Sequence, residues 1–175
     1  MEGIRRAVEA GLDVSVNTPL CRLNADYAST LALIHSLGVR FVTVSGLICT
    51  GGAVGKYAEN DLTSDELFEA VKAAKAFCDA HDMEMDFTSP GLIPAEKLDS
   101  LDMNIPSCGA CLSNMAIAPD GTVVPCQSWL GTDAGLGHIL RDDWKKIWNH
   151  AACKRLRSMT DGEALTCPFR NRGEV

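Results

Sequence analysis

Three cysteines constrain this chain most, because they lie in the short stretch from Cys108 to Cys126 with a turn signal between them. Cys108 and Cys111 are two residues apart, and Asp120-Gly121, ahead of Cys126, strongly favours a tight hairpin turn. The flanking segments 115–118 and 122–124 are apolar or β-branched enough to form two short strands. Such a hairpin folds Cys126 back beside the first two thiols. Convergent thiols indicate a bound metal, an iron–sulfur cluster or a disulfide.

The cysteine content helps to separate a disulfide from a metal or cluster. Eight cysteines in 175 residues are many, and disulfide frameworks are typical of short secreted chains. The start of the sequence, MEGIRRAVEAG, contains no apolar signal-peptide core. We therefore expect a cytoplasmic protein whose cysteines hold a metal or a cluster. The net charge of −7 argues against nucleic acid and anionic membranes as partners. No segment approaches the length of a transmembrane helix.

The first half of the chain alternates between helical and strand patterns. Helices are expected at 2–11, 24–37 and 63–81, and strands at 13–18, 39–47 and 83–88. This alternation favours βαβ units and a parallel sheet. The outer strands would leave unpaired backbone groups at the sheet edges. Phe41, Val42 and Val44 are expected to add an exposed apolar surface. The chain would then be either a homodimer that covers this surface through its half barrels or a poorly soluble fragment.

The last of these helices has the clearest local signals. Thr63-Ser64-Asp65-Glu66 has the spacing of a capping box, which predicts a helix beginning there. One face of this helix carries apolar residues at helical spacing and should be buried. They are Leu67, Val71, Ala74 and Cys78.

The stretch after Cys108 follows a recognisable order. Gly121 lies five residues before Cys126, and Gly137-His138-Ile139, a Trp-bearing helical stretch at 144–157 and Cys167 come after it. This order resembles the SPASM or Twitch domain, the auxiliary iron–sulfur extension of radical S-adenosylmethionine (SAM) enzymes. The phrases VSVNTPLCRLN and LGVRFVTVSGLICTGGA are similar to late strands of that family's barrel.

The resemblance implies an α/β fold in three parts. Residues 1–90 would form a partial parallel (β/α) barrel of about three strand–helix units. Residues 91–107 would be a linker, and residues 108–175 a truncated, Cys-rich domain of a β-hairpin and a helix. The family's CxxxCxxC loop is not in this sequence, so we expect a piece or a degenerate relative of such an enzyme that does not cleave SAM by itself.

The resemblance also implies the site residues. A 4Fe-4S auxiliary cluster would be bound by Cys108, Cys111, Cys126 and Cys167. As a fourth ligand, Cys153 fits the family order less well than Cys167, because it lies inside a helical stretch. In some relatives the auxiliary cluster has only three protein ligands and keeps one iron open for substrate. In the intact enzyme SAM would be cleaved to a radical that acts on a peptide or small-molecule substrate. Asn17 matches a position where the family places a polar residue facing SAM, although bonding to loop backbone accounts for a strand-end asparagine equally well.

A zinc-stabilised binding module without catalysis could use the same thiols, since Cys-x-x-Cys is also zinc-finger spacing. The sequence leaves both this module and the cluster domain open. Cys21 and Cys49 follow expected strands and either line a pocket or pack as small apolar residues. Trp144, Ile147 and Trp148 have helical spacing and are expected in the core of the small domain.

Overall fold

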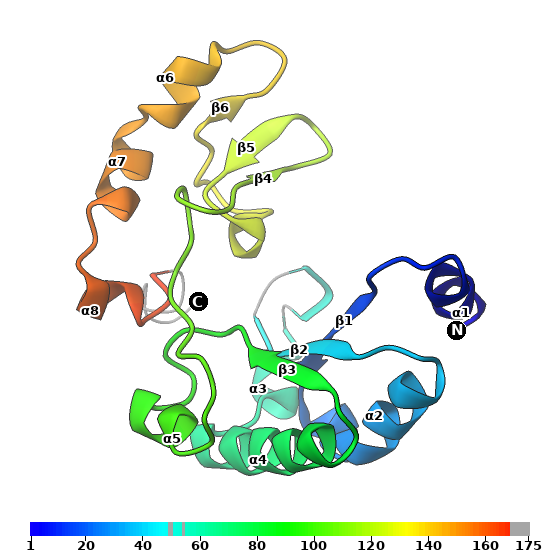
Figure 1. Cartoon of the computed structure of the whole chain (residues 1–175). Coiled ribbons are helices and arrows are strands. Elements are labelled where there is room, and N and C mark those ends of the chain that lie inside the picture. Colours follow the sequence, from blue (N-terminus) through cyan, green and yellow to red (C-terminus); the bar gives the residue numbers. More distant parts are fainter. Residues whose placement is uncertain (49–50, 54, 169–175) are drawn as a thin grey trace. The chain divides into compact units, whose positions relative to one another are not determined.

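The computed structural model describes residues 1–48, 51–53 and 55–168, and the chain divides into two compact units (Figure 1). One unit comprises Met1–Leu47 and Tyr57–Pro106, and the other comprises Ile48–Lys56 and Ser107–Val175. Among the described helices, none combines the length and the apolar character needed to cross a bilayer.

A three-stranded parallel sheet forms the centre of the first unit. Its strands are β1 (Ser15–Leu20), β2 (Phe41–Gly46) and β3 (Glu84–Phe87), in that spatial order (Figure 1). The α/β class and the parallel pairing expected from the sequence are therefore confirmed. The described strands of this sheet do not close into a barrel.

Helices cover one face of this sheet. The strands are connected by α2 (Tyr27–Ser36) and α4 (Ser64–Ala80), which pack against each other and lie on the same side of the sheet (Figure 1). Right-handed crossovers between strands in sequential order place both helices on one side. Shorter elements complete the unit: α1 (Glu2–Glu9), η1 (Arg22–Asn24), α3 (Tyr57–Asn60) and α5 (Ala95–Asp99).

The capping box and the buried stripe of α4 are confirmed. Thr63 Oγ1 accepts the backbone N–H of Glu66 at 3.2 Å, and the Glu66 carboxylate accepts the N–H of Thr63 at 2.8 Å. All the expected apolar residues of this helix are buried beneath it, namely Leu67, Val71, Ala74 and Cys78. They share one core with buried residues of α2, β2 and β3.

The helix expected from Asn24 begins later, at Tyr27. The Asn24 side chain instead accepts the N–H of Cys21 at 2.8 Å and donates to the carbonyl of Pro19 at 3.0 Å. These bonds close the short η1 turn, so Asn24 serves the turn and not the helix.

The face of the sheet that α2 and α4 leave uncovered is less apolar than the sequence suggests. Val42 and Val44 are 2% and 0% exposed, so they do not form the apolar surface that the sequence suggests. Successive side chains of a strand point to opposite faces, and both valines point toward the helices. Phe41 is 41% exposed and lies on the other face, which is otherwise mainly polar. Its polar residues are Ser15, Asn17, Thr43, Ser45, Glu84 and Asp86.

The second unit is built on a small antiparallel sheet. Its strands, in spatial order, are β4 (Ala116–Ile117), β5 (Thr122–Val124) and β6 (Gly137–His138). The turn expected at Asp120-Gly121 is present, since the N–H of Gly121 donates to the carbonyl of Ala118 at 2.9 Å. The remaining described elements are η2 (Gly51–Ala53), η3 (Gln127–Trp129), α6 (Trp144–Trp148), α7 (Ala151–Arg157) and α8 (Asp161–Ala164).

The Trp-bearing stretch is two helices and not one. α6 ends at Trp148, and His150 begins α7 by accepting the N–H of Ala152 at its Nδ1, at 3.2 Å. Ile147 is fully buried as expected, but Trp144 is 49% exposed, so its expected place in the core is wrong. Trp148 is half-buried, and its ring lies 6.2 Å from that of Trp144.

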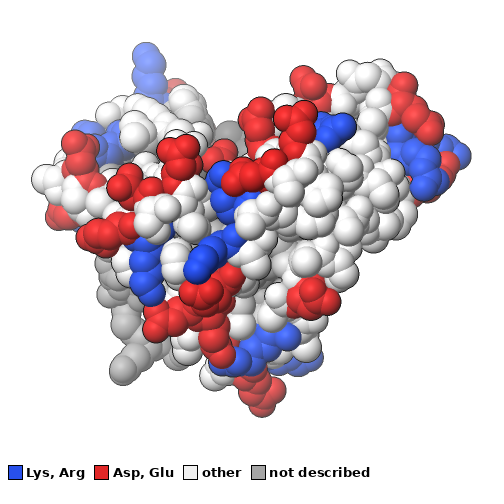
Figure 2. All heavy atoms as spheres, turned by 60° about the horizontal axis from the view of Figure 1, so that its bottom comes forward, with Lys and Arg blue, Asp and Glu red and all other residues white. Residues whose placement is uncertain are grey.

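Charges of both signs mix on the helical surface. Figure 2 shows Lys and Arg side chains lying among Asp and Glu side chains on the face that it presents. Two close pairs are Lys75 with Asp79 and Lys97 with Asp65, each with an N···O distance of 2.6 Å. Exposed pairs of this kind contribute little to stability. The surface seen in this view is therefore a mixed, solvated one.

Candidate metal centre

The segment that carries the Cys-x-x-Cys forms a tight turn. The carbonyl of Gly109 accepts the N–H groups of Leu112, Ser113 and Asn114 at 3.0 to 3.1 Å. Cys111 adopts a left-handed backbone conformation with φ of 58°, which lets the chain reverse at this point. We call residues 108–114 the thiol loop.

The hairpin joins the thiol loop to the third cysteine. The N–H of Cys111 donates to the carbonyl of Pro125 at 3.0 Å, directly before Cys126. This bond brings the start of the hairpin and its end together, as the turn signal at Asp120-Gly121 indicates. Cys126 itself follows β5 in extended conformation and precedes η3.

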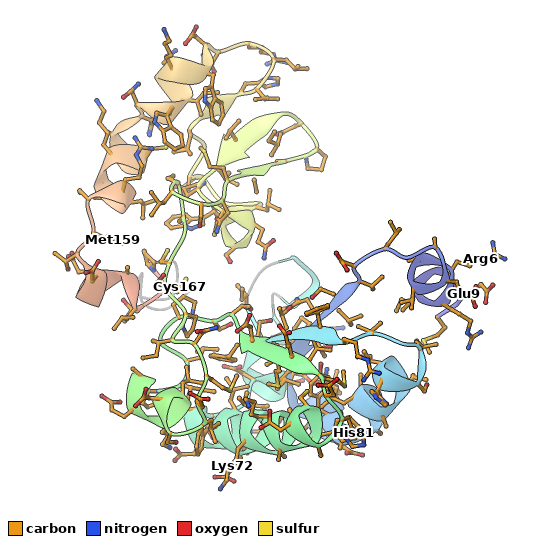
Figure 3. All side chains as sticks on the ribbon, viewed as in Figure 1. Arg6, Glu9, Lys72, His81, Met159 and Cys167 are labelled. Atoms are coloured by element: carbon orange, nitrogen blue, oxygen red, sulfur yellow. The ribbon has the colours of Figure 1, made fainter. Side chains whose placement is uncertain are left out.

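Cys167 approaches the same loop from the end of the described chain. The N–H of Cys108 donates to the carbonyl of Ala164, the last residue of α8, at 2.7 Å. Figure 3 shows Cys167 in the segment that follows this helix. Cys108 consequently has both Cys126 and Cys167 among its electrostatic neighbours.

The thiols of this unit differ in exposure. Cys108, Cys126 and Cys167 are half-buried, whereas Cys111 and Cys153 are fully buried at 0% exposure. Burial raises the pKa of Cys108, partly opposed by a hydrogen bond from the Ala110 backbone, and the nearby Cys167 and Cys126 raise it further. Burial also raises the pKa of Cys111, and a hydrogen bond with the Cys153 side chain adds to the shift.

The fit of a metal to these residues follows from their chemistry. Thiolates are the ligands of iron–sulfur clusters and of structural zinc, and metal binding keeps them deprotonated. In residues 1–48, 51–53 and 55–168, no three His, Cys, Asp or Glu side chains are grouped closely enough to hold a metal ion. The ligand type therefore fits a metal or cluster. Cys126 and Cys167 are both electrostatic neighbours of Cys108, but the described thiols are not preassembled around a metal position.

The candidate residues outside this centre have local roles. The Asn17 side-chain oxygen accepts a hydrogen bond from the Thr43 hydroxyl at 2.9 Å on the polar face of the sheet. Cys21 is half-buried and its N–H is engaged by Asn24. Cys78 is fully buried in the core of the first unit. Cys49 lies outside the described residues.

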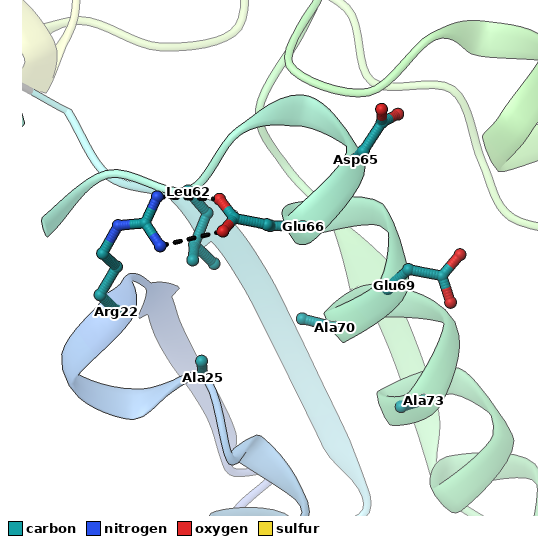
Figure 4. Close-up of a pocket in the computed structure, with 8 residues that line it drawn as sticks. All are labelled: Arg22, Ala25, Leu62, Asp65, Glu66, Glu69, Ala70 and Ala73. Carbon is teal, nitrogen blue, oxygen red and sulfur yellow. Dashed lines mark hydrogen bonds and ion pairs between the residues drawn. The ribbon is translucent and has the colours of Figure 1, made fainter.

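The first unit has an open groove between η1 and α4. Figure 4 shows it with the Arg22 guanidinium facing the Glu66 carboxylate, which it contacts through two bonds of 2.9 and 3.0 Å. Ala25, Leu62 and Ala70 are among the residues that line it. Arg22 and Glu66 form a bidentate ion pair with each other. This pair connects η1 to α4, so we assign it a structural role.

The comparisons with known proteins bear on the second unit. Residues 108–170 match the family model of SPASM, an iron-sulfur cluster-binding domain. The SPASM match spans every described cysteine of this unit and supports the resemblance seen in the sequence. It indicates that this segment binds an iron–sulfur cluster. No curated protein matches the chain.

Two residues that matter to this centre are not evident from the sequence motif. Cys153 fits the family order less well than Cys167, yet it contacts Cys111. Arg157 donates to the carbonyl of Cys111 at 3.4 Å and to the carbonyl of Trp148 at 2.7 Å. The spacing of Cys153 and Leu156, three apart on one helix, is the signal that both face the core.

Proposed function

We propose that this chain is the auxiliary iron–sulfur-cluster-binding portion of a radical SAM enzyme, of the type that modifies peptides or proteins. The SPASM match over residues 108–170 carries the proposal. The position of Cys108 as an electrostatic neighbour of both Cys126 and Cys167 supports it, because thiols are the ligand type that clusters require.

The residues of the second unit have defined parts in this function. Cys108, Cys111, Cys126 and Cys167 are the candidate ligands that would hold a 4Fe-4S cluster through their sulfur atoms. When bound, such a cluster supplies an electron-transfer centre or an iron to which substrate attaches. The hairpin and the Cys108–Ala164 backbone bond position two of these ligands. Cys108, Cys126 and Cys167 are half-buried, and Cys108 and Cys126 pack against the core of the unit.

The first unit has a proposed place in the same enzyme. We assign its three strands to a partial parallel barrel whose polar face, with Asn17 and Thr43, would meet SAM and a peptide or small-molecule substrate. The single helical layer and the polar character of the opposite face support this assignment. We further propose a cytoplasmic enzyme and a homodimer joined through the half barrels.

Anaerobic reconstitution with iron and sulfide tests the cluster. The protein should turn brown, show a broad charge-transfer band, and contain iron and sulfide in near-equal amounts. Cys108→Ala and Cys126→Ala should lose most of the colour, because each removes a thiolate that anchors one cluster corner. Cys21→Ser is the matched control, since Cys21 is also half-buried but belongs to the other unit.

The result would contradict the proposal if the protein stayed colourless and bound one tight zinc ion. In that case the thiols would form a zinc-stabilised binding module, with tetrahedral coordination by Cys sulfur. Both iron and zinc are measured on the same anaerobic sample, so the two functions are separated in one experiment.

A further inference from the structure

The two cysteines of the Cys-x-x-Cys point to different surroundings. Cys108 is half-buried and has Cys126 and Cys167 nearby. Cys111 has no exposed surface and lies in one buried cluster with Cys153, which also has none, although Cys126 is an electrostatic neighbour of Cys111 too. By exposure, the described thiols of the second unit fall into a half-buried set of three, Cys108, Cys126 and Cys167, and a fully buried pair, Cys111 and Cys153.

The backbone holds Cys111 in its inward position. Its N–H donates to the carbonyls of Asn114 and Pro125, both at 3.0 Å. Its own carbonyl accepts a bond from Arg157, whose guanidinium also lies 4.2 Å from the centre of the Trp148 ring. These bonds fix the backbone of Cys111 while its thiol lies in the buried cluster of the second unit, so Cys111 would bind a metal beside Cys108 only if its thiol left that cluster.

Cys153 is held from the other side. Its Sγ donates to the carbonyl of Ile147 at 3.4 Å, across the break between α6 and α7. The surrounding residues are apolar and buried, which excludes water from the pair. They are Ala110, Val123, Leu136, Ile147 and Leu156.

We infer that Cys111 holds no metal in this protein and instead forms with Cys153 a buried thiol pair that fixes the thiol loop to α7. This inference rests on the proposed cluster function and narrows its ligands to Cys108, Cys126 and Cys167. Cys111 then has a structural role in the core of the second unit and is not a ligand.

The amount of iron and sulfide bound after reconstitution shows whether Cys111 is a cluster ligand or a buried structural residue. After anaerobic reconstitution, Cys111→Ala and Cys153→Ala should keep iron and sulfide per folded protein within twofold of the wild type. Cys108→Ala should lose most of both. Cys111→Gly is a second variant, because glycine adopts the left-handed conformation at φ of 58° without strain and keeps the turn. If both Cys111 variants remain folded and lose the cluster as Cys108→Ala does, the inference is overturned.

Thermal unfolding of the metal-free protein tests the pairing itself. Cys111→Ala and Cys153→Ala should each lower the melting temperature, and the double variant should be less destabilised than the sum of the two. Cys78→Ala is the control, because Cys78 is equally buried but lies in the other unit, and its effect should add to that of Cys111→Ala. Additive effects of Cys111 and Cys153 would overturn the pairing.

Alkylation of native, metal-free protein gives a third measurement. Iodoacetamide should modify Cys108 and Cys126 well before Cys111 and Cys153, as judged by mass spectrometry of digested protein. Equal rates would overturn the inward placement. Wild-type protein that takes up no iron and sulfide would contradict the cluster function alone, since unfolding and alkylation would still decide the pair.

Discussion

Glu66 is the residue whose charge the fold stabilises most clearly. The Arg22 guanidinium is the largest cause, with the Thr63 backbone and hydroxyl next, and together they lower the pKa of this carboxyl from 4.5 to about 2. A carboxyl with a lowered pKa in the folded state stabilises the protein above the unfolded pKa. That contribution is lost as the pH falls from about 4.5 toward about 2.

The pH dependence of unfolding tests this assignment. Glu66→Gln should lower the unfolding midpoint at pH 7, and its deficit relative to wild type should shrink as the pH falls from about 5 to about 2. Glu69→Gln is the control on the same helix, since Glu69 reaches only Lys72 among the described ion pairs, at 3.9 Å. A Glu66→Gln deficit that is constant with pH would show that its charge has no part in stability. Urea unfolding at several pH values measures both.

For individual residues, the sequence predicts only part of the candidate metal centre. The approach of Cys126 to the Cys-x-x-Cys follows from Asp120-Gly121, because that dipeptide fixes a local turn. The separation of Cys111 from Cys108 does not follow, since it depends on the left-handed conformation of Cys111 and on contacts with α7, which lies about 40 residues further along the chain. The Cys-x-x-Cys spacing alone does not predict whether each thiol is buried or exposed.

The hairpin between β4 and β5 depends on one glycine. Gly121 has φ of 91°, and a Cβ placed there would lie 2.6 Å from the imidazole ring of His138. Gly121→Ala should therefore add both left-handed strain, about 1–2 kcal/mol, and a steric clash. Gly131 also has positive φ, of 78°, but a Cβ there meets no described atom within 4 Å.

Comparing Gly121→Ala with Gly131→Ala separates the steric clash with His138 from the left-handed strain that both variants share. We expect Gly121→Ala to lower the free energy of unfolding by about 1 kcal/mol more than Gly131→Ala. In a His138→Ala background this difference should disappear, because the imidazole is the group that the new methyl meets. Equal effects of the two single variants in urea unfolding would show that the contact with His138 is relieved without cost.

At the element scale, the sequence predicts well where the determinants are local. The beginning of α4 and its buried stripe follow from the capping box and the helical spacing of Leu67 and Val71. The prediction fails for the stretch 144–157, because apolar spacing alone suggests one helix. The side chain of His150 accepts a backbone N–H and starts a second helix there. A histidine cap is a weak sequence signal compared with Thr63, so the break is not visible in the sequence.

The alternation of side chains accounts for the error at the sheet. Phe41, Val42 and Val44 do not form one surface, because odd and even positions of a strand face opposite ways. The sequence indicates the strand and its partners, but the face that the helices cover is decided by the handedness of the crossovers. The sheet is consequently less apolar on its open face than expected, and assembly would depend on Phe41 and on the strand edges.

The dimer proposed for the whole molecule can be tested at Phe41. This ring is 41% exposed and lies in register with Ser15 of β1 and Glu84 of β3, on the open face. In a two-fold dimer the same patch meets its own copy, so a charge placed there is repeated across the interface. Phe41→Asp should therefore convert the dimer to a monomer. Leu33→Asp, at a position 46% exposed on α2, should leave it intact because α2 lies on the helical side. Light scattering at micromolar concentration measures both variants, and a wild-type chain that is monodisperse and monomeric would contradict the dimer.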